Sequence, residues 1–316
     1  MEWFTPDPAG SSHYPKNADW PLVSIVTVNY NQSGVTMEFL KSLRGCTYPN
    51  LEVFVVDNGS PNDNPLKIKD YFPEIHLCLT HQNLGFAGGN NVALPKSSGK
   101  YILFINNDTE VEPDFLQPLV ELLESDSSIG MVSPKIHFFH TPLTFQFAGF
   151  TPLSLITIRN EAIGFGEKDQ GQYDITVETG SIFGAAMLVP RKVIDTVGPM
   201  SEVFFLYYEE HDWAEHIKRA GYKIFYCGKS FVRHKESIST VKESPFQIFY
   251  LNRGRIIFAR RNRFGLTKLF SMIYLMGVAM PKSAFTFAMQ GRNDLSKAIW
   301  KALWWNITTC RKQLVH

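Results

Sequence analysis

The strongest constraint on this chain is an alternation of short apolar runs with segments of helical periodicity. The apolar runs are LVSIVTVNYN (22–31), LEVFVVDNGS (51–60), IHLCLT (75–80) and YILFINND (101–108), and helix-like stretches at 33–46, 66–71 and 115–125 lie between or after them. Strands that are apolar on both faces belong to parallel sheets covered by helices on each side. The alternation therefore predicts an α/β fold with a doubly wound, Rossmann-like, mostly parallel sheet.

Three of these runs end in polar side chains: Asn29 and Asn31, Asp57 and Asn58, and Asn106 to Asp108. In open α/β sheets, ligands bind at the carboxyl ends of the strands. The glycine-rich segment NLGFAGGNN (83–91) follows the third run and allows a ligand to approach the backbone closely. The sequence therefore predicts a ligand site at this edge of the sheet.

The alternation breaks after about residue 130. The segments MVSPKIHFF, TFQFAGF and SIFGAAMLVP have strand character, an acidic helix is expected from residue 209 to 220, and KIFYCGKSFVRH (223–234) has strand character again. We expect an irregular arm at 1–20, a compact domain at 21–245 with halves at 21–130 and 131–245, and a helical region at 246–316.

Charge is distributed unevenly, although the formal net charge is only +1. From residue 253 onward there are 12 Lys and Arg residues and one acid, Asp294, whereas the preceding residues hold 19 basic and 29 acidic residues. An acidic body disfavours nucleic-acid binding, and a basic tail favours an anionic partner.

The composition of the tail favours a membrane surface as that partner. The segment LSKAIWKALWW (295–305) combines Trp with Lys, and arginines are concentrated at 253–263. The apolar run Leu269–Met280 ends at Pro281 and is shorter than the roughly 20 residues that span a bilayer. We therefore expect 253–305 to lie on an anionic membrane surface, with packing on the domain or a dimer interface as the alternatives.

Cysteine usage and the N-terminus suggest where the protein works. Four scattered cysteines without a CxxC pair exclude a disulfide scaffold and a cysteine-ligated zinc finger. The first 20 residues have neither a basic start nor an apolar core, so they do not resemble a secretory signal. Both observations predict a reducing, cytoplasmic location.

Seven segments in order resemble the inverting family 2 glycosyltransferases of the GT-A fold, in particular bacterial rhamnosyltransferase-like polysaccharide enzymes. They are VSIVTVNYN, VVDNGS, NLGFAGGNN, INND, FGAAMLVPR, FFLYYEEHDW and VRH, and they cover about residues 23 to 234. The resemblance implies transfer of a sugar, with inversion, from dTDP-rhamnose or a UDP-hexose to a glycan or lipid-linked acceptor in surface polysaccharide synthesis. An inactive relative that binds a nucleotide sugar or glycan is the alternative.

The resemblance also implies roles for particular residues. Residues 21–130 would be the nucleotide-binding half, where Asp57 would accept a hydrogen bond from an imide N–H of uracil or thymine. Residues 131–245 would be the acceptor half. The implied nucleotide-binding residues are Thr27, Asn29, Tyr30, Asp57, Asn83, Gly85 and Asn107, and the donor or acceptor pocket would include Gly184, Ala185 and Trp213.

The remaining implied roles are metal binding and catalysis. GT-A enzymes commonly hold a divalent ion with Asp-x-Asp, but Asn106 stands in the first position here, which leaves Asp108 and, by resemblance, His234 as ligands for Mn²⁺ or Mg²⁺. In the acidic cluster YYEEHDW, Glu210 would be the general base. Glu209 and Asp212 would bind acceptor hydroxyls or hold the loop.

Overall fold

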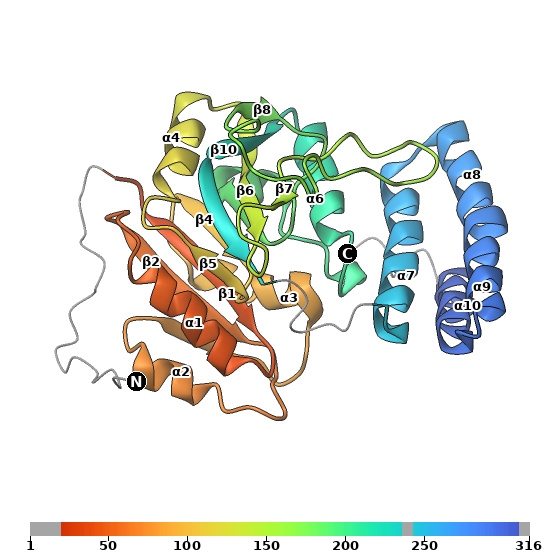
Figure 1. The fold of residues 1–316 in the computed structure, drawn as a ribbon, viewed down its shortest axis with the longest axis horizontal. Helices are drawn as coiled ribbons and strands as arrows, with labels where there is room; N and C mark the ends of the chain where they lie inside the picture. The colour runs from red at the N-terminus through yellow and green to blue at the C-terminus, as the bar shows by residue number, and fades with distance from the viewer. Residues whose placement is uncertain (1–19, 236–242, 310–316) are drawn as a thin grey trace.

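The computed structural model describes residues 20–235 and 243–309. The predicted N-terminal arm lies outside these residues except for Trp20, which packs edge-on against Tyr48 with 5.3 Å between the ring centroids. One large sheet dominates the structure, with the strand order β3-β2-β1-β4-β9-β6-β10-β5 (Figure 1).

The sheet confirms the predicted parallel arrangement. Strand β1 pairs in parallel with β2 and β4, β2 with β3, and β6 with β10, whereas β9 runs antiparallel between β4 and β6. The strands are β1 (Val23–Asn29), β2 (Leu51–Asp57), β3 (His76–Leu79), β4 (Tyr101–Ile105), β5 (Thr109–Val111), β6 (Ile129–Phe138), β7 (Phe145–Phe147), β8 (Thr176–Glu178), β9 (Ala186–Pro190) and β10 (Lys223–His234).

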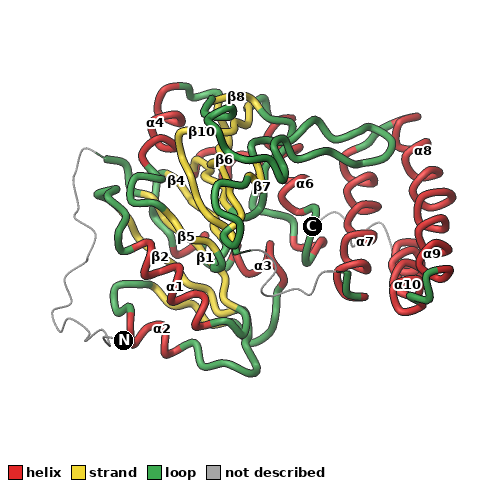
Figure 2. Tube along the Cα trace, in the orientation of Figure 1, coloured by secondary structure: helices red, strands yellow, loops and turns green. Residues whose placement is uncertain are grey.

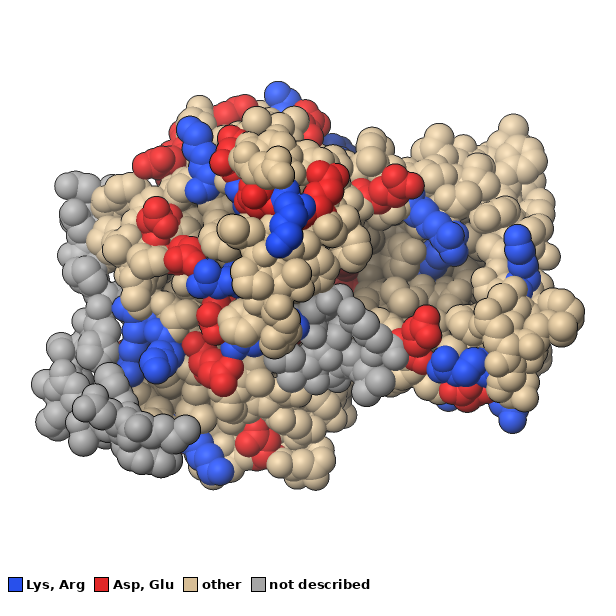
Figure 3. All heavy atoms as spheres, in the orientation of Figure 1, with Lys and Arg blue, Asp and Glu red and all other residues tan. Residues whose placement is uncertain are grey.

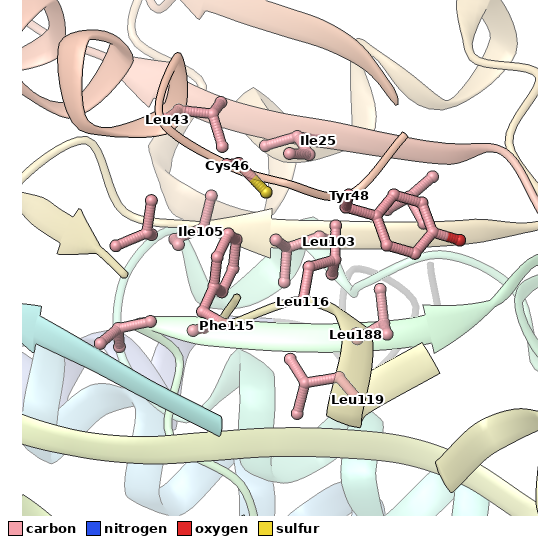
Figure 4. Packing of buried hydrophobic residues seen from close by; sticks show 14 of the residues in the cluster. Ile25, Leu43, Cys46, Tyr48, Leu103, Ile105, Phe115, Leu116, Leu119 and Leu188 are labelled. Carbon is pink, nitrogen blue, oxygen red and sulfur yellow. The ribbon is translucent and has the colours of Figure 1, made fainter. Parts of the chain in front are cut away.

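Helices cover both faces of this sheet, which makes it doubly wound (Figure 2). On one face lie α1 (Ser33–Leu43), α2 (Leu66–Tyr71) and α4 (Gln117–Ser125), and on the other lie α3 (Gly85–Asn91), α5 (Arg191–Val197) and α6 (Glu209–Arg219). All five residues of β4 are buried, since both faces are covered. Figure 4 shows Leu43 and Leu119, from the helices of the first face, packed around Leu103 and Ile105 of β4.

Four helical segments follow the sheet and form a block beside it (Figure 1): α7 (Pro245–Asn262), α8 (Gly265–Ile273), α9 (Met280–Met289) and α10 (Asn293–Thr308). Helices α8 and α9 are joined by a π-helical turn, Tyr274–Ala279, so Gly265–Met289 is one helix of 25 residues. The apolar run that ends at Pro281 is therefore only part of a longer helix, and the expectation that this segment is too short to span a bilayer is wrong. The Met280 N–H bonds to the Leu275 carbonyl, and this wider turn accommodates a proline ring that would clash in a regular helix.

The arginines of α7 do not form the expected anion-facing surface, because most of them point inward. Arg253 donates to the carbonyls of Phe204 (2.7 Å) and Val203 (2.6 Å), and Arg255 donates through Nε to the Thr157 carbonyl (2.8 Å). Arginine has five donors and can saturate the carbonyls of irregular loops that lack strand partners. The basic charge of this segment therefore holds loops in place.

Candidate functional site

A cavity of about 440 Å³ opens at the carboxyl ends of β1 and β4. The start of α3, the start of α6 and the start of α7 close its other sides. Its lining includes Val28, Tyr30, Asn58, Asn83, Gly85, Phe86, Asn106, Asn107, Asp108, Gln146, Phe183, Gly184, Ala185, Phe205, Tyr207, Glu209, Glu210, His234, Phe246 and Gln247. The cavity thus lies at the edge of the sheet that the sequence predicts.

The loop that leads into α6 directs two acids into this cavity. Phe205, Tyr207 and Tyr208 have positive φ angles of 66°, 67° and 76°, which are unfavourable for side chains of this size. The loop is held by Arg253 at one end and by a 2.6 Å hydrogen bond from the Phe86 N–H to the Phe205 carbonyl. Backbone strain of this kind is found where a functional group has to be held in place.

Glu209 and Glu210 begin α6 and both line the cavity, but they differ in environment. Glu209 is 3% exposed, and burial, followed by the charge of Glu210, raises its pKa well above the usual range. Glu210 is more open, with 18% of its side chain exposed, and the Oε2 of both acids has no hydrogen-bond partner among the described residues. An unpartnered carboxylate oxygen that faces a cavity can take a proton from a bound hydroxyl group.

The raised pKa of Glu209 predicts a pH-dependent cost to stability. The protonated carboxyl of Glu209 contributes fully to the stability of the folded state below pH 4.5, the usual pKa of a glutamate. This contribution is lost as the pH rises through the raised pKa of Glu209 in the folded state. We expect Glu209→Gln to unfold at a higher Tm than the wild type near pH 8, with the two curves converging near pH 4. Thermal unfolding at the two pH values measures this, and equal Tm differences at both would contradict it.

A second polar group joins the end of β10 to the loop after β4. His234 Nε2 lies 3.1 Å from Asp108 Oδ1 and 3.4 Å from Asn106 Nδ2. The other ring nitrogen, Nδ1, lies 2.8 Å from Gln146 Oε1, and an acceptor there assigns the ring proton to Nδ1. The contact between Nδ1 and Gln146 is the second-shell arrangement of many metal-bound histidines, and it leaves Nε2, beside Asp108, as the nitrogen that can bind a cation.

This donor set fits a divalent ion that is shared with a bound ligand. Within residues 20–235 and 243–309 there is no cluster of three or more His, Cys, Asp or Glu residues that could hold a metal. Asp108 and His234 supply one carboxylate and one imidazole, and the Asn106 amide is a weaker oxygen donor. Ligand oxygens would complete such a site.

Behind the cavity wall, a chain of hydrogen bonds links the loop after β4 to the loop after β2. Asn107 Nδ2 donates to Thr36 Oγ1 (2.9 Å), which donates to Asn29 Oδ1 (2.8 Å). Asn29 Nδ2 in turn donates to Asp57 Oδ1 (2.8 Å), and Ser60 also donates to this carboxylate. The network fixes the two loops relative to each other.

The predicted nucleotide-binding residues are therefore divided between two layers. Tyr30, Asn83, Gly85 and Asn107 line the cavity. Asn29 and Asp57 are buried beneath it in the network, and the role of Asp57 as a reader of the base stays a prediction.

Three predicted site residues lie elsewhere. Thr27 is buried on the opposite face of β1 from Val28, because side chains alternate along a strand, so it does not line the cavity. Trp213 is buried in the core, where its ring meets Phe104 edge-on and its Nε1–H donates to the Gly198 carbonyl (2.9 Å). The expectation that Trp213 lines the pocket is wrong, whereas Gly184 and Ala185 do line it.

Asp212 also turns away from the cavity. Its Oδ1 accepts hydrogen bonds from Arg261 Nε (3.0 Å) and Asn262 Nδ2 (2.6 Å), both of which belong to the end of α7. It is 1% exposed, so it holds α6 against α7 and is not available to bind acceptor hydroxyls. Of the two roles expected for it, the one that holds the loop region in place agrees with the geometry.

Sequence reasoning missed several parts of the site. Gln146 orients His234, and the one signal in the sequence was a polar residue within the apolar run TFQFAGF. Phe183, Phe205 and Phe246 form an apolar part of the lining, and they come from three separate segments. No local pattern distinguishes such residues from those of an ordinary core.

Residues 24–189 match the sequence profile of glycosyl transferase family 2. This match covers more than half of the chain, which therefore belongs to glycosyl transferase family 2.

Relatives and solved structures agree with this assignment. The chain is 24% identical over 241 residues to the low-salt glycan biosynthesis hexosyltransferase Agl10 of Haloferax volcanii, with 74% of each chain covered. It is 21% identical to an N-acetylglucosaminyl-diphospho-decaprenol L-rhamnosyltransferase of Mycobacterium tuberculosis, covering 75% of this chain and 83% of that one. It covers only 25% of a third relative, the uncharacterized protein y4gI of Sinorhizobium fredii.

Among solved structures, the mannosyltransferase PcManGT of Pyrobaculum calidifontis, in complex with GDP-Man and Mn²⁺, has the same fold. The TM-score is 0.58 at 16% identity, covering 96% of this chain and 91% of that one. The S. aureus TarS structure in complex with UDP has a TM-score of 0.54 at 16% identity, covering 89% and 82% of the two chains. The predicted GT-A fold is thereby confirmed.

Proposed function

We propose that this glycosyltransferase transfers a sugar from a nucleotide diphosphate donor with inversion at the anomeric carbon, and that Glu210 is the general base. The observation that carries the proposal is the position of Glu210, the more open of the two acids that begin α6, in the same cavity as Asp108 and His234. The acceptor oxygen attacks the anomeric carbon, its proton passes to Glu210, and the nucleotide diphosphate leaves. One displacement of this kind inverts the configuration.

The donor is proposed to be dTDP-rhamnose or a UDP-hexose. Asp57 ends β2 at the edge of the sheet that carries the cavity, where an acceptor-only group would select the imide N–H of uracil or thymine. Both of its oxygens accept hydrogen bonds from Asn29 and Ser60, so a base would replace one of these donors. The mycobacterial relative is by name a rhamnosyltransferase, and the TarS structure holds UDP. Glycan or lipid-linked acceptors of surface polysaccharide synthesis complete the proposed reaction.

Asp108 and His234 are proposed to hold Mn²⁺ or Mg²⁺, with Gln146 fixing the imidazole in the tautomer that a ligand needs. The ion would neutralise the negative charge of the leaving diphosphate. The GDP-Man complex of PcManGT contains Mn²⁺, which supports a divalent ion in this fold. We also propose that the protein works in the cytoplasm, peripherally bound to the inner face of the cell membrane.

A panel of nucleotide sugars tests the proposed function. The purified chain would be incubated with UDP-hexoses, dTDP-rhamnose and GDP-mannose, with Mn²⁺ or Mg²⁺ and a lipid extract as the acceptor source. We expect release of UDP or dTDP from one donor, and none after chelation of the metal. Release from GDP-mannose alone would contradict the pyrimidine assignment. Nucleotide binding by calorimetry without turnover would favour the inactive, sugar-binding alternative that Asn106 suggests.

A further inference from the structure

The C-terminal helices expose an unusual amount of apolar surface. Eleven of the 20 exposed large hydrophobic residues of the described chain lie between Phe264 and Ile307. We call the exposed side chains of the last three helical segments the hairpin face: Leu266, Leu269, Phe270, Ile273, Val278, Phe285 and Met289 on α8–α9, and Trp300, Trp304 and Ile307 on α10. Few charged side chains interrupt the flank of α8 and α9 in Figure 3. An apolar patch of this extent marks an interaction surface.

The opposite side of the same helices packs against the rest of the protein. Leu275, Met280 and Ala284 of the long helix belong to one buried cluster with Ile299 and residues 256–259 of α7. Gly265–Met289 is the one described helix that is long and apolar enough to cross a membrane, and 17% of its apolar window is buried. A crossing helix would have to leave the contacts of its buried side, whereas a helix that lies along the bilayer surface keeps them.

The charges around the hairpin face favour lipid over a second protein chain. Lys282, Lys297 and Lys301 are exposed, and the two lysines of α10 accompany Trp300 and Trp304. Tryptophan and lysine side by side are typical of the level of the lipid headgroups, where both side chains keep a polar end in water. Asp294 is the one acid of the described helical segments from residue 265 to 309, and it lies 3.7 Å from Arg292, so a second copy of this face would offer the exposed lysines almost no acid to pair with.

We propose that the hairpin face inserts into one leaflet of a lipid bilayer, and that apolar burial, not electrostatic adsorption, holds it there. The arginines that could have bound an anionic membrane surface point into the protein instead, where they donate hydrogen bonds to backbone carbonyls and to Asp212. Helix α7 lies between the hairpin and the cavity, since Phe246 and Gln247 at its start line the cavity while residues 256–259 contact the hairpin. If the proposed transferase function holds, the acceptor is bilayer-anchored and reaches the cavity beside α7.

Vesicle flotation of the full chain tests the insertion, and it does not depend on transferase activity. We expect binding to neutral phosphatidylcholine vesicles, retained at about 0.5 M NaCl, where surface charges are screened. Insertion should also shift the Trp fluorescence to shorter wavelength. The triple variant Leu269→Asp, Ile273→Asp, Phe285→Asp should bind at least ~100-fold more weakly, because three apolar side chains no longer enter the hydrocarbon.

The matched control is Leu66→Asp, Leu143→Asp, Phe165→Asp, which changes three similarly exposed apolar residues of the sheet domain and should bind as the wild type does. Binding to anionic vesicles alone, lost at high salt, would overturn insertion in favour of adsorption. A dimer in analytical ultracentrifugation that the hairpin variant dissociates, without vesicle binding, would assign the face to a second copy. Donor hydrolysis by the detergent-free enzyme tests the proposed function separately.

Discussion

Glu210→Gln is expected to lower kcat by about 10²–10⁴-fold, the usual contribution of a general base. Glutamine keeps the size of the side chain and removes its capacity to take a proton, so donor binding and the KM for the donor should change little. Glu210 lies at the start of α6 beside Gly184, where an added Cβ would touch Glu210 Cγ at 3.8 Å, so the glycine leaves this side of Glu210 uncovered. Steady-state kinetics on the donor found in the panel measures the effect.

The matched control is Glu215→Gln on the same helix. Glu215 forms an i,i+3 ion pair with Lys218 and does not line the cavity, so its loss should leave kcat within about twofold, as for other surface ion pairs. Full activity of Glu210→Gln together with inactive Glu209→Gln would transfer the role of base to Glu209. Equal loss in both would indicate that the cluster acts as one unit.

Asp108→Ala is the second large effect expected. The variant removes the carboxylate that lies 3.1 Å from His234 among the described residues, and we expect a loss of about 10³-fold in transfer activity, since the proposed ion would supply several kcal/mol of charge stabilisation. Calorimetric titration of Mn²⁺ in the presence of UDP should show weakened metal binding by the same variant. This readout does not require turnover.

Asp70→Ala serves as the control for Asp108→Ala, because Asp70 is an exposed carboxylate on α2, remote from the cavity lining. It should match the wild type in both measurements. Unchanged Mn²⁺ affinity in Asp108→Ala would remove Asp108 from the metal site. Lost activity with unchanged metal binding would assign it a role toward the substrate instead.

The first half of the fold could be predicted closely because each signal there is local. The apolar runs become β1 to β4, and the predicted helix at 66–71 is α2 with the same bounds. The second half could be predicted less well. Strands β5 and β8 have three residues each and too few positions to show a period, and β9 joins the sheet in the antiparallel direction through long-range pairing.

In the candidate site, too, some residues could be predicted from the sequence and others could not. The carboxyl ends of the strands indicated Asn107 and Asp108 correctly as cavity residues, because the rule for parallel sheets needs only strand order. The acids of α6 could not be separated in this way. Successive helical residues point in directions about 100° apart, so packing decides that Glu210 faces the cavity and that Asp212 faces α7.

By itself, the sequence determined the parallel sheet, the edge that carries the cavity and the types of chemical group placed there. Hydrophobic periodicity and the order of the strands along the chain can be read from short stretches of sequence, so they can be recognised without knowing how the elements pack. The resemblance already implied that His234 and Asp108 belong to one site, but tertiary structure alone decided that Gln146 orients His234 and that Arg253 and Arg255 of α7 are buried. These pairings join segments distant in the chain, and which of them form depends on the side chains that compete for each buried position.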